Sequence, residues 1–379
     1  MREIRFGIVG AGMMGREFAT AAARWPALLD LDVAPRVVAL CDTNRDLFDW
    51  YRQNFASIET FTDDYHDVLA NPDIDAVYCA VPHNLHAGLY TEIIGAGKHL
   101  LGEKPFGIDL AANARIMQAI DQHPDVLVRV SSEFPFYPGA QRVIQAVRDD
   151  LIGQIIEVRC GLLHSSDLDP NKPINWKRMV RFNGEYGCMG DLGMHAVHLP
   201  FRFGWYPSNV RALLSNLVAE RPDGEGGLVP CETWDNALLL TQVEKDGFTF
   251  PMTIETKRIA PGETNTWYIE VTGMRGSTRF STKQPKTLWT MEYVPGHEQS
   301  WRSTDLQYTS AYPTITGNVF EFGFADAILQ MWAAFLDEIA HGKDMTQPFH
   351  CATPQEAHWS HRLFSAALQS HAASSVVAV

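Results

Sequence analysis

Residues 4–15 of the chain read IRFGIVGAGMMG, a short apolar run followed by three spaced glycines. The spacing G-x-G-x-x-G after a strand-like run is typical of the turn that binds the pyrophosphate of a dinucleotide. Gly10 permits the tight turn, Gly12 lets the backbone approach the pyrophosphate, and Gly15 lets helix and strand pack closely. The start of the next helix, with Met13 and Met14, offers free N–H groups to a phosphate.

The second expected strand, residues 36–41, ends in Asp42. A carboxylate at this point accepts hydrogen bonds from the hydroxyls of an adenosine ribose and repels a 2′-phosphate. We therefore predict that the cofactor is NAD rather than NADP. Arg45 lies three residues further on and could instead hold a 2′-phosphate, and a helix cap is the other interpretation of Asp42.

The composition excludes several classes of protein. A formal net charge of −14 argues against nucleic acid as a partner. The sequence contains no run of 18 apolar residues, so no membrane-spanning helix is predicted. The six cysteines are scattered without C-x-x-C spacing, which favours reduced thiols over disulfides or zinc. Because the first strand begins almost at the N-terminus without a signal peptide, we expect a cytoplasmic protein.

The chain of 379 residues is long enough for two domains, each with its own core. Residues 1–128 alternate strands and helices, which predicts a Rossmann domain with a doubly wound parallel sheet. Residues 129–379 predict an α+β domain for substrate binding and oligomerisation, built on a large, mostly antiparallel open sheet. Strands are expected at 4–9, 36–41, 76–81, 98–101, 126–131, 154–164, 208–218, 235–242, 249–258, 266–273 and 277–281, and helices at 13–24, 44–54, 64–70, 86–95, 109–121, 138–150, 324–341 and 354–370.

Four further motifs give the chain a resemblance to a known family. Besides the glycine turn they are Val81-Pro82-His83-Asn84-Leu85-His86, Glu103-Lys104-Pro105, Asp191-Leu192-Gly193-Met194-His195 and Gly273-Met274-Arg275-Gly276-Ser277. With this set the chain resembles the glucose–fructose oxidoreductase/inositol dehydrogenase (Gfo/Idh/MocA) family over nearly its whole length. Two segments depart from the family's usual pattern: His83 stands where Asn is common, and Ser131-Ser132-Glu133 stands where Asn-x-Arg is common.

The resemblance implies an NAD(P)-dependent dehydrogenase that acts on sugars, polyols or their derivatives. Some members instead use the cofactor in redox-neutral cleavage of glycosides. The resemblance also implies a set of cofactor contacts beyond the glycine turn, at Val81, Pro82, His83, His86, Glu103, Lys104, Trp176 and Arg178.

Three residues are candidates for catalysis. Lys104 follows a strand whose carboxyl end should lie at the ligand-binding edge of the sheet, where its ammonium could stabilise an alkoxide. Asp191 and His195 are spaced to share one helix face, so the carboxylate could orient the imidazole as a general base. His198 extends the same face, which raises a metal site as an alternative; we predict none, because hydride transfer with lysine and histidine needs no Lewis acid.

The substrate contacts are predicted around the same residues. Four cations crowd into residues 172–181, namely Lys172, Lys177, Arg178 and Arg181, so the substrate could be anionic unless they form a solvated loop. The predicted substrate-binding set is Lys104, His164, Lys177, Arg178, Tyr186, Asp191 and His195. An exposed face of the second sheet would further favour a homodimer or homotetramer.

Together these features predict an NAD-dependent dehydrogenase that oxidises a secondary hydroxyl of a carbohydrate. The alternative is a redox-neutral, NAD-dependent glycoside hydrolase, in which a base such as Tyr186 or His164 drives elimination after transient oxidation. A non-enzymatic regulator that keeps the cofactor fold is the third interpretation, disfavoured by the presence of all three candidate catalytic residues.

Overall fold

All residues, 1–379, are described by a computed structural model in which the chain divides into two compact units. The first unit comprises Met1–Gly107, Ala111–Phe136 and Thr309–Pro354. The second comprises Ile108–Leu110, Tyr137–Tyr308 and Gln355–Val379. No helix combines the length and the apolar character that crossing a membrane requires.

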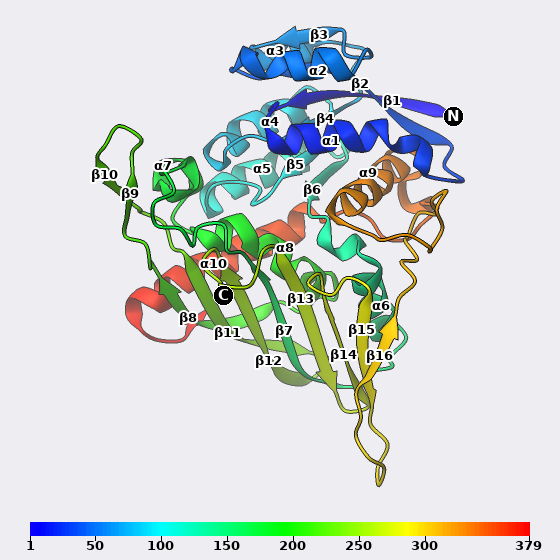
Figure 1. Cartoon of the computed structure of the whole chain (residues 1–379), viewed down its shortest axis with the longest axis vertical. Helices are drawn as coiled ribbons and strands as arrows, with labels where there is room; N and C mark the ends of the chain where they lie inside the picture. Colours follow the sequence, from blue (N-terminus) through cyan, green and yellow to red (C-terminus); the bar gives the residue numbers. More distant parts are fainter. The chain divides into compact units, whose positions relative to one another are not determined.

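The first unit contains a parallel sheet of six strands in the order β3-β2-β1-β4-β5-β6, which confirms the predicted Rossmann topology (Figure 1). Its central strands are apolar on both faces, as a sheet covered by helices on both sides requires. Their carboxyl ends are aligned, since Val9 pairs with Cys79, and Cys79 with Gly102. The strands are β1 (Arg2–Val9), β2 (Val33–Cys41), β3 (Thr60–Thr62), β4 (Ala76–Cys79), β5 (His99–Glu103) and β6 (Val128–Ser131).

The helices of this unit include one from far along the chain. They are α1 (Met13–Ala23), α2 (Phe48–Asn54), α3 (Tyr65–Ala70), α4 (His86–Gly95), α5 (Leu110–Gln122) and α9 (Phe324–His341), with 3₁₀ turns η1 (Trp25–Ala27), η2 (Arg45–Leu47), η3 (His83–Leu85), η4 (Phe134–Phe136) and η6 (Gly342–Asp344).

Helix α9 was expected within residues 129–379, but it belongs to the compact unit of the Rossmann sheet. The reason is its apolar face: Trp332 stacks on Phe6 of β1 at 5.1 Å between ring centroids and meets Phe18 of α1 edge-on at 3.6 Å. That residues 1–128 bind the cofactor and residues 129–379 bind the substrate stays a prediction.

The second unit is built on a nine-stranded sheet in the order β16-β15-β14-β13-β7-β12-β11-β8-β17 (Figure 1). Only β7 and β12 pair in parallel, so the sheet is mostly antiparallel, as predicted. Its strands are β7 (Ile155–Leu163), β8 (Pro207–Ser215), β11 (Asn236–Lys245), β12 (Phe248–Lys257), β13 (Thr266–Gly273), β14 (Gly276–Ser281), β15 (Thr287–Glu292), β16 (Arg302–Asp305) and β17 (Val377–Ala378), while β9 (Glu220–Pro222) and β10 (Leu228–Pro230) form a separate hairpin.

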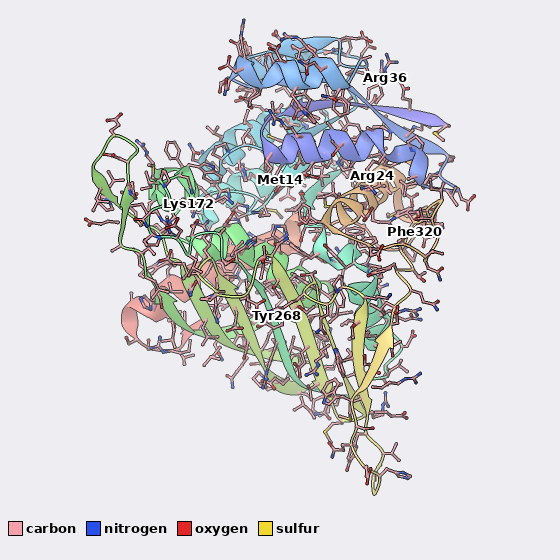
Figure 2. The ribbon with its side chains drawn as sticks, in the orientation of Figure 1. Met14, Arg24, Arg36, Lys172, Tyr268 and Phe320 are labelled. Carbon is pink, nitrogen blue, oxygen red and sulfur yellow. The ribbon has the colours of Figure 1, made fainter.

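Side chains alternate between the two faces of this sheet. On β12, Met252, Ile254 and Thr256 are buried, while the side chains between them are more exposed. On the other face Tyr268 of β13, labelled in Figure 2, covers Gly161 of β7 and donates a hydrogen bond of 2.6 Å to Glu255 of β12. A side chain at Gly161 would meet the Tyr268 ring at 2.7 Å, which explains the glycine.

The helices of the second unit are α6 (Pro138–Arg148), α7 (Val180–Asn183), α8 (Cys188–Arg202) and α10 (Pro354–Ala373), with the 3₁₀ turn η5 (Trp176–Arg178). Helix α8 is buried from Cys188 to Phe201, because it packs on β7 and β12 and also meets α10. At Gly193 a side chain would come within 2.3 Å of the Phe364 ring, so close packing of α8 and α10 requires glycine there.

The expected elements are present, with shifts at their ends. The strands missed by the sequence analysis are short or irregular in pattern: β3, β9, β10, β15, β16 and β17. The second strand was expected at 36–41, yet β2 begins at Val33 and runs through Pro35, where the parallel pairing with β1 is already formed. Residues 44–54 divide into the turn η2 and the shorter helix α2.

Candidate active site

The glycine turn has the geometry of a phosphate cradle. Gly10 has φ +104°, and a side chain on it would lie 2.2 Å from the carbonyl oxygen of Ala80. A side chain on Gly15 would lie 2.1 Å from the carbonyl oxygen of Gly10. A side chain on Gly12 would meet no atom outside its own stretch of chain within 4 Å, and no side chain caps the N-terminus of α1, so its first N–H groups can meet an anion.

Met13 and Met14 lie beside this opening, and their predicted contacts with the cofactor stay a prediction. Met13 begins α1 and is 76% exposed, and Met14, labelled in Figure 2, is half-buried beside it. Below the turn, Tyr51 donates a hydrogen bond of 3.2 Å to the carbonyl oxygen of Ala11. The turn is thus supported from inside the unit and open where a pyrophosphate would lie.

Asp42 follows β2 and lies against the same turn. One of its carboxylate oxygens accepts a hydrogen bond of 2.7 Å from the N–H of Ala11, and the other accepts one of 2.8 Å from Asn44. Each oxygen keeps a lone pair for a ribose hydroxyl. Arg45 is held by Asp63 through two hydrogen bonds of 3.0 and 2.8 Å, so this arginine is already engaged by an acid. These contacts favour NAD over NADP.

Replacing Asp42 with Asn should narrow the preference for NAD. The amide keeps one acceptor for the N–H of Ala11 but removes the charge that repels a 2′-phosphate. We expect the ratio of the Kd values for NADP and NAD to fall by about 10-fold or more, since one charged hydrogen bond is worth roughly 1.5–3 kcal/mol. Calorimetric titration with both cofactors measures it, and an unchanged ratio would assign Asp42 to the turn alone.

The segment Val81–His86 follows β4 at the same edge of the sheet. Its two histidines are buried, with exposed fractions of 3% for His83 and 0% for His86. His86 accepts from the N–H of Gly107 at 3.4 Å through Nδ1, which leaves Nε2–H to donate to the carbonyl oxygen of Val81 at 3.1 Å. The observed contacts of His86 therefore fix the loop that begins with Val81 and Pro82, and direct contact with the cofactor stays a prediction.

Lys104 follows β5, so it lies at the carboxyl edge of the parallel sheet, as predicted. The side chain is half-buried. The preceding Glu103 is 8% exposed and is held by two tyrosines: Tyr78 Oη donates to its carboxylate at 2.7 Å, and Tyr90 Oη donates to its carbonyl oxygen at 2.9 Å. Burial, together with the Glu103 carboxylate, raises the pKa of Tyr78 well above its usual value, so the hydroxyl remains a donor.

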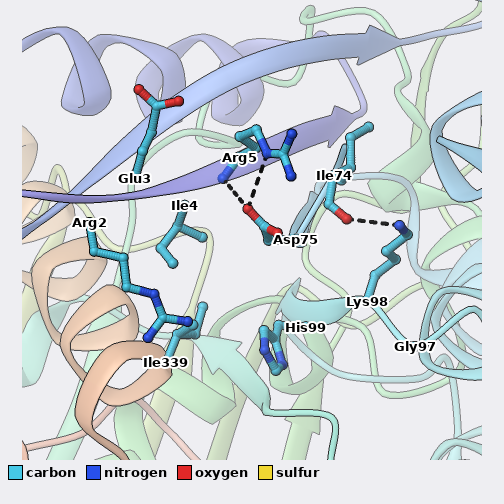
Figure 3. A pocket seen from close by; sticks show the side chains of 10 residues that line it. All are labelled: Arg2, Glu3, Ile4, Arg5, Ile74, Asp75, Gly97, Lys98, His99 and Ile339. Atoms are coloured by element: carbon cyan, nitrogen blue, oxygen red, sulfur yellow. Dashed lines mark hydrogen bonds and ion pairs between the residues drawn. The ribbon is translucent and has the colours of Figure 1, made fainter. Parts of the chain in front are cut away.

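A pocket of about 540 Å³ lies elsewhere in this unit and is shown in Figure 3. It is lined by the beginnings of β1 and β5, where Arg2, Arg5 and His99 stand, and thus lies at the amino edge of the sheet. Its charges are largely engaged within the pocket: Arg5 pairs with Asp75, and Lys98 donates to the carbonyl oxygen of Ile74 at 2.8 Å. Ligands of open parallel sheets bind at the carboxyl edge, so this pocket is not the predicted site.

The second unit holds the other candidate catalytic residues, on α8. Asp191 is 4% exposed and lies in the first turn of the helix, where a carboxylate is favoured by the helix dipole. Lys177 Nζ lies 3.1 Å from both oxygens of Asp191, and the buried guanidinium of Arg258 lies 3.0 Å from one of them. Two cations therefore hold the Asp191 carboxylate in place.

Arg258 was not predicted as a site residue. It follows β12, and its guanidinium also donates to the carbonyl oxygen of Lys177 at 3.0 Å, so it joins the lysine and the aspartate. No motif in the sequence surrounds Arg258, and only the pairing of β12 with β7 brings it to α8.

His195 stands one turn after Asp191 and is 6% exposed. Its carbonyl oxygen accepts a hydrogen bond of 2.8 Å from the indole of the buried Trp267, which anchors this turn of α8 to β13. His198 points to a different group: its Nε2 lies 2.9 Å from Arg202 and 3.6 Å from Glu356. The structure contains no group of three His, Cys, Asp or Glu side chains arranged to hold a metal ion.

Arg178 was predicted to contact cofactor and substrate, but its side chain is completely buried. The guanidinium forms an ion pair with the equally buried carboxylate of Asp235 and lies 3.9 Å from Asp167. Asp235 in turn accepts from the N–H groups of Leu217 and Val218 at 2.6 and 3.0 Å. These contacts explain why Arg178 is buried: it forms an internal ion pair. They give no support to its predicted contacts with cofactor and substrate.

Two of the other three cations of the cluster are also paired with acids. Lys172, labelled in Figure 2, pairs with Asp167 at 3.0 Å, and Lys177 pairs with Asp191. Arg181 lies over the Phe182 ring at 4.5 Å. Because acids of the same unit neutralise most of the cluster, its charge does not favour an anionic substrate.

Replacing Asp235 with Asn should destabilise the protein rather than alter catalysis directly. The change leaves the buried Arg178 guanidinium without its main counter-ion, which typically costs about 3–5 kcal/mol. Urea denaturation measures the loss of unfolding free energy. An unchanged unfolding free energy combined with a raised KM would instead support the prediction that Arg178 contacts the substrate.

Two further predicted substrate residues, Tyr186 and His164, and the predicted cofactor contact Trp176 lie in the second unit. Tyr186 is 3% exposed, and its hydroxyl lies 2.7 Å from Ser365 Oγ; burial raises its pKa to about 12, so it is poorly suited as a base. His164 follows β7 and is half-buried, and Trp176 is half-buried in η5 with the Lys177 ammonium 5.7 Å from its ring centre. The contacts of Tyr186 therefore do not favour the glycosidase alternative.

The fold and the sequence patterns agree with comparisons to known proteins. Residues 4–131 match an oxidoreductase family with an NAD-binding Rossmann fold, and residues 140–279 match the C-terminal domain of GFO/IDH/MocA proteins. Levoglucosan dehydrogenase of Pseudarthrobacter phenanthrenivorans is 25% identical over 306 residues, which is 76% of either chain. The inositol 2-dehydrogenase/D-chiro-inositol 3-dehydrogenase of Shouchella clausii is 28% identical over 157 residues, 41% of this chain and 44% of that protein.

Solved structures show the same architecture. Levoglucosan dehydrogenase in complex with NADH and L-sorbose superimposes with a TM-score of 0.87 at 22% identity, over 100% of this chain and 99% of that one. An oxidoreductase domain protein from Kribbella flavida gives a TM-score of 0.89 at 23% identity over 100% of both chains. The protein is thus an oxidoreductase with an NAD-binding Rossmann domain and an α+β domain. It belongs to the Gfo/Idh/MocA family, as its sequence motifs indicated.

Proposed function

We propose that the protein is an NAD-dependent dehydrogenase that oxidises a secondary hydroxyl of a sugar, polyol or sugar derivative. The observation that carries the proposal is the position of Lys104. It leaves β5 at the same edge of the parallel sheet where the glycine turn leaves β1. A cation at this edge is suited to bind the oxygen of an alcohol that is being oxidised.

In this proposal each residue has a distinct task. NAD, when bound, supplies the acceptor for the hydride that leaves the substrate carbon. Lys104 binds the substrate oxygen and stabilises the negative charge that develops on it. His195 accepts the hydroxyl proton, and Asp191, fixed by Lys177 and Arg258 one turn earlier on α8, orients the imidazole as the base.

The substrate class rests on the named relatives and on the charge balance of the second unit. One relative is named for levoglucosan and another for inositols, which are uncharged polyhydroxy compounds. In this chain most cations near η5 are paired with acids, as an uncharged ligand would require. We therefore propose a neutral carbohydrate as substrate.

The test is a panel of sugars, polyols, sugar acids and aryl glycosides, followed by absorbance of reduced nicotinamide. Net formation of NADH with one neutral class would support the proposal. Release of aglycone that needs NAD but leaves NADH unchanged would instead establish the redox-neutral glycoside hydrolase. Activity on sugar acids alone would overturn the neutral substrate class.

We also propose that the protein acts as a homodimer or homotetramer through the sheet of the second unit. The face of this sheet opposite α8 carries exposed leucines, with Leu213 50% and Leu240 48% exposed. Exposed apolar side chains on a broad sheet face favour association. Light scattering in solution measures the mass, and a monomer at micromolar concentration would contradict the proposal.

A further inference from the structure

Arg258 joins two separate segments of the second unit that carry candidate site residues. It is 2% exposed, and its guanidinium has two different partners. Nη1 donates to the carbonyl oxygen of Lys177 in η5 at 3.0 Å, and Nη2 lies 3.0 Å from the Asp191 carboxylate in α8. The Lys177 ammonium reaches the same carboxylate at 3.1 Å. Arg258 therefore contacts both the backbone of Lys177 and the acid that holds its side chain.

The backbone on either side of this link is fixed by further hydrogen bonds. The N–H of Lys177 donates to Asn175 Oδ1 at 3.0 Å, and its carbonyl oxygen also accepts from Thr233 Oγ1 at 2.9 Å. Arg258 follows the end of β12, and its own N–H donates to the carbonyl oxygen of Asp235 at 2.9 Å. The guanidinium thus connects a turn held in place to the first turn of α8, from a support on the sheet.

The arginine suits this position through its shape. Its planar guanidinium presents several N–H groups in a fixed fork, so it can serve two acceptors on different elements at once. A lysine keeps the charge but not the fork. A buried ion pair adds little stability compared with well-packed apolar side chains of the same volume. The geometry that Arg258 imposes on Lys177 and Asp191 therefore explains its presence better than stability does.

From these contacts we propose that Arg258 is a positioning residue: it fixes the Lys177 ammonium and the Asp191 carboxylate relative to each other, and thereby the polar groups that meet a hydroxyl of the substrate. The inference rests on the proposed function, with Lys177 and Asp191 in the substrate site. Arg258 itself is too deeply buried to contact the substrate. It acts only through its two partners.

The first test is Arg258→Lys. A displacement of binding groups by about 1 Å can cost on the order of 10²-fold in rate, so we expect kcat/KM to fall by about that factor, with a raised KM. The Kd for NAD should change little, because the glycine turn and Asp42 are untouched. Steady-state kinetics and calorimetric titration with NAD measure these quantities. If R258K keeps the kcat/KM of the natural protein, the proposal is wrong.

The matched control is Arg221→Lys. Arg221 is another completely buried arginine of the same unit, and its guanidinium donates to the carbonyl oxygens of Asp167, Asp169 and Lys172 at 2.6, 2.7 and 3.3 Å. None of these residues belongs to the predicted substrate-binding set. R221K should lower the Tm and leave KM nearly unchanged. If R221K and R258K lose the same share of kcat/KM, Arg258 acts through stability alone.

A double variant separates positioning from general loss of structure. Lys177→Met removes the ammonium that Arg258 is proposed to place. In the K177M background, R258K should therefore lower kcat/KM by no more than about twofold further, since the two changes affect one interaction. An equal loss from R258K in both backgrounds would overturn the proposal. Should R258K fail to fold, Thr233→Val removes the other donor to the same carbonyl oxygen, and an unchanged KM in T233V would overturn it.

A last measurement needs no substrate. Urea denaturation of D191N, R258K and the double variant should give losses of unfolding free energy that are less than additive, because the two side chains are in contact. Additive losses would overturn the link between Arg258 and Asp191 itself. A protein that couples the two residues in this way, yet oxidises no carbohydrate, would overturn the proposed function and not the link.

Discussion

Lys104→Met is expected to lower kcat by about 10²–10⁴-fold, the range typical for the loss of a group that handles charge or protons in the transition state. The substitution keeps the length and apolar body of the side chain and removes the ammonium. The glycine turn and Asp42 remain intact, so the Kd for NAD should change little. Steady-state kinetics and calorimetric titration with NAD measure the two quantities separately.

The matched control is Lys98→Met. Lys98 precedes β5, at the amino edge of the same sheet, and its ammonium donates to the carbonyl oxygens of Asn71 and Ile74 at 2.8 Å. Loss of these contacts should affect stability and leave kcat nearly unchanged. If K104M keeps full activity, or if K98M loses as much as K104M does, Lys104 is not the residue that binds the substrate oxygen.

The fold could be predicted because local patterns and long-range packing agree for most of the chain. The apolar run before Gly10 is a buried central strand, and the alternation in residues 266–273 is that of a strand with one buried face. The short edge strands β3 and β17, of three and two residues, could not be predicted, because an alternation of apolar and polar side chains cannot be recognised over so few residues.

The positions of the candidate residues in the fold were predictable only where a motif fixes both residue type and element, and their roles stay predictions. Gly10, Asp42 and Lys104 lie at strand ends of the expected sheet, and their positions follow from the βα order. Arg178 shows the opposite case: a basic residue in a loop looks available for a ligand, and only the fold brings the buried Asp235 against it. Arg258 was missed for the same reason.

Glu133 was noticed only as a departure from the family's usual Asn-x-Arg. The sequence shows that an acid stands there, but its environment depends on the register of β5 and β6. Ionisation behaviour is set by burial and neighbouring charges, which a sequence read residue by residue does not contain. For this reason the chemistry of an acid can be inferred only after its strand has been placed.

His195→Ala is the second change expected to lower kcat by about 10²–10⁴-fold, because it removes the proposed proton acceptor. The hydrogen bond from the Trp267 indole goes to the carbonyl oxygen of residue 195 and survives the substitution. Helix α8 should therefore keep its position, and alanine is compatible with a helix interior. A base supplied from solution should then restore part of the lost rate.

The decisive measurement is rescue by imidazole in the H195A variant. A dehydrogenase that lost only its proton acceptor should recover kcat in proportion to the concentration of neutral imidazole. His198→Ala is the control on the same helix: its side chain contacts Arg202 and Glu356, so this variant should lose stability and show no rescue. If imidazole fails with H195A while the variant still binds NAD and remains folded, His195 contributes through packing, and another group accepts the proton.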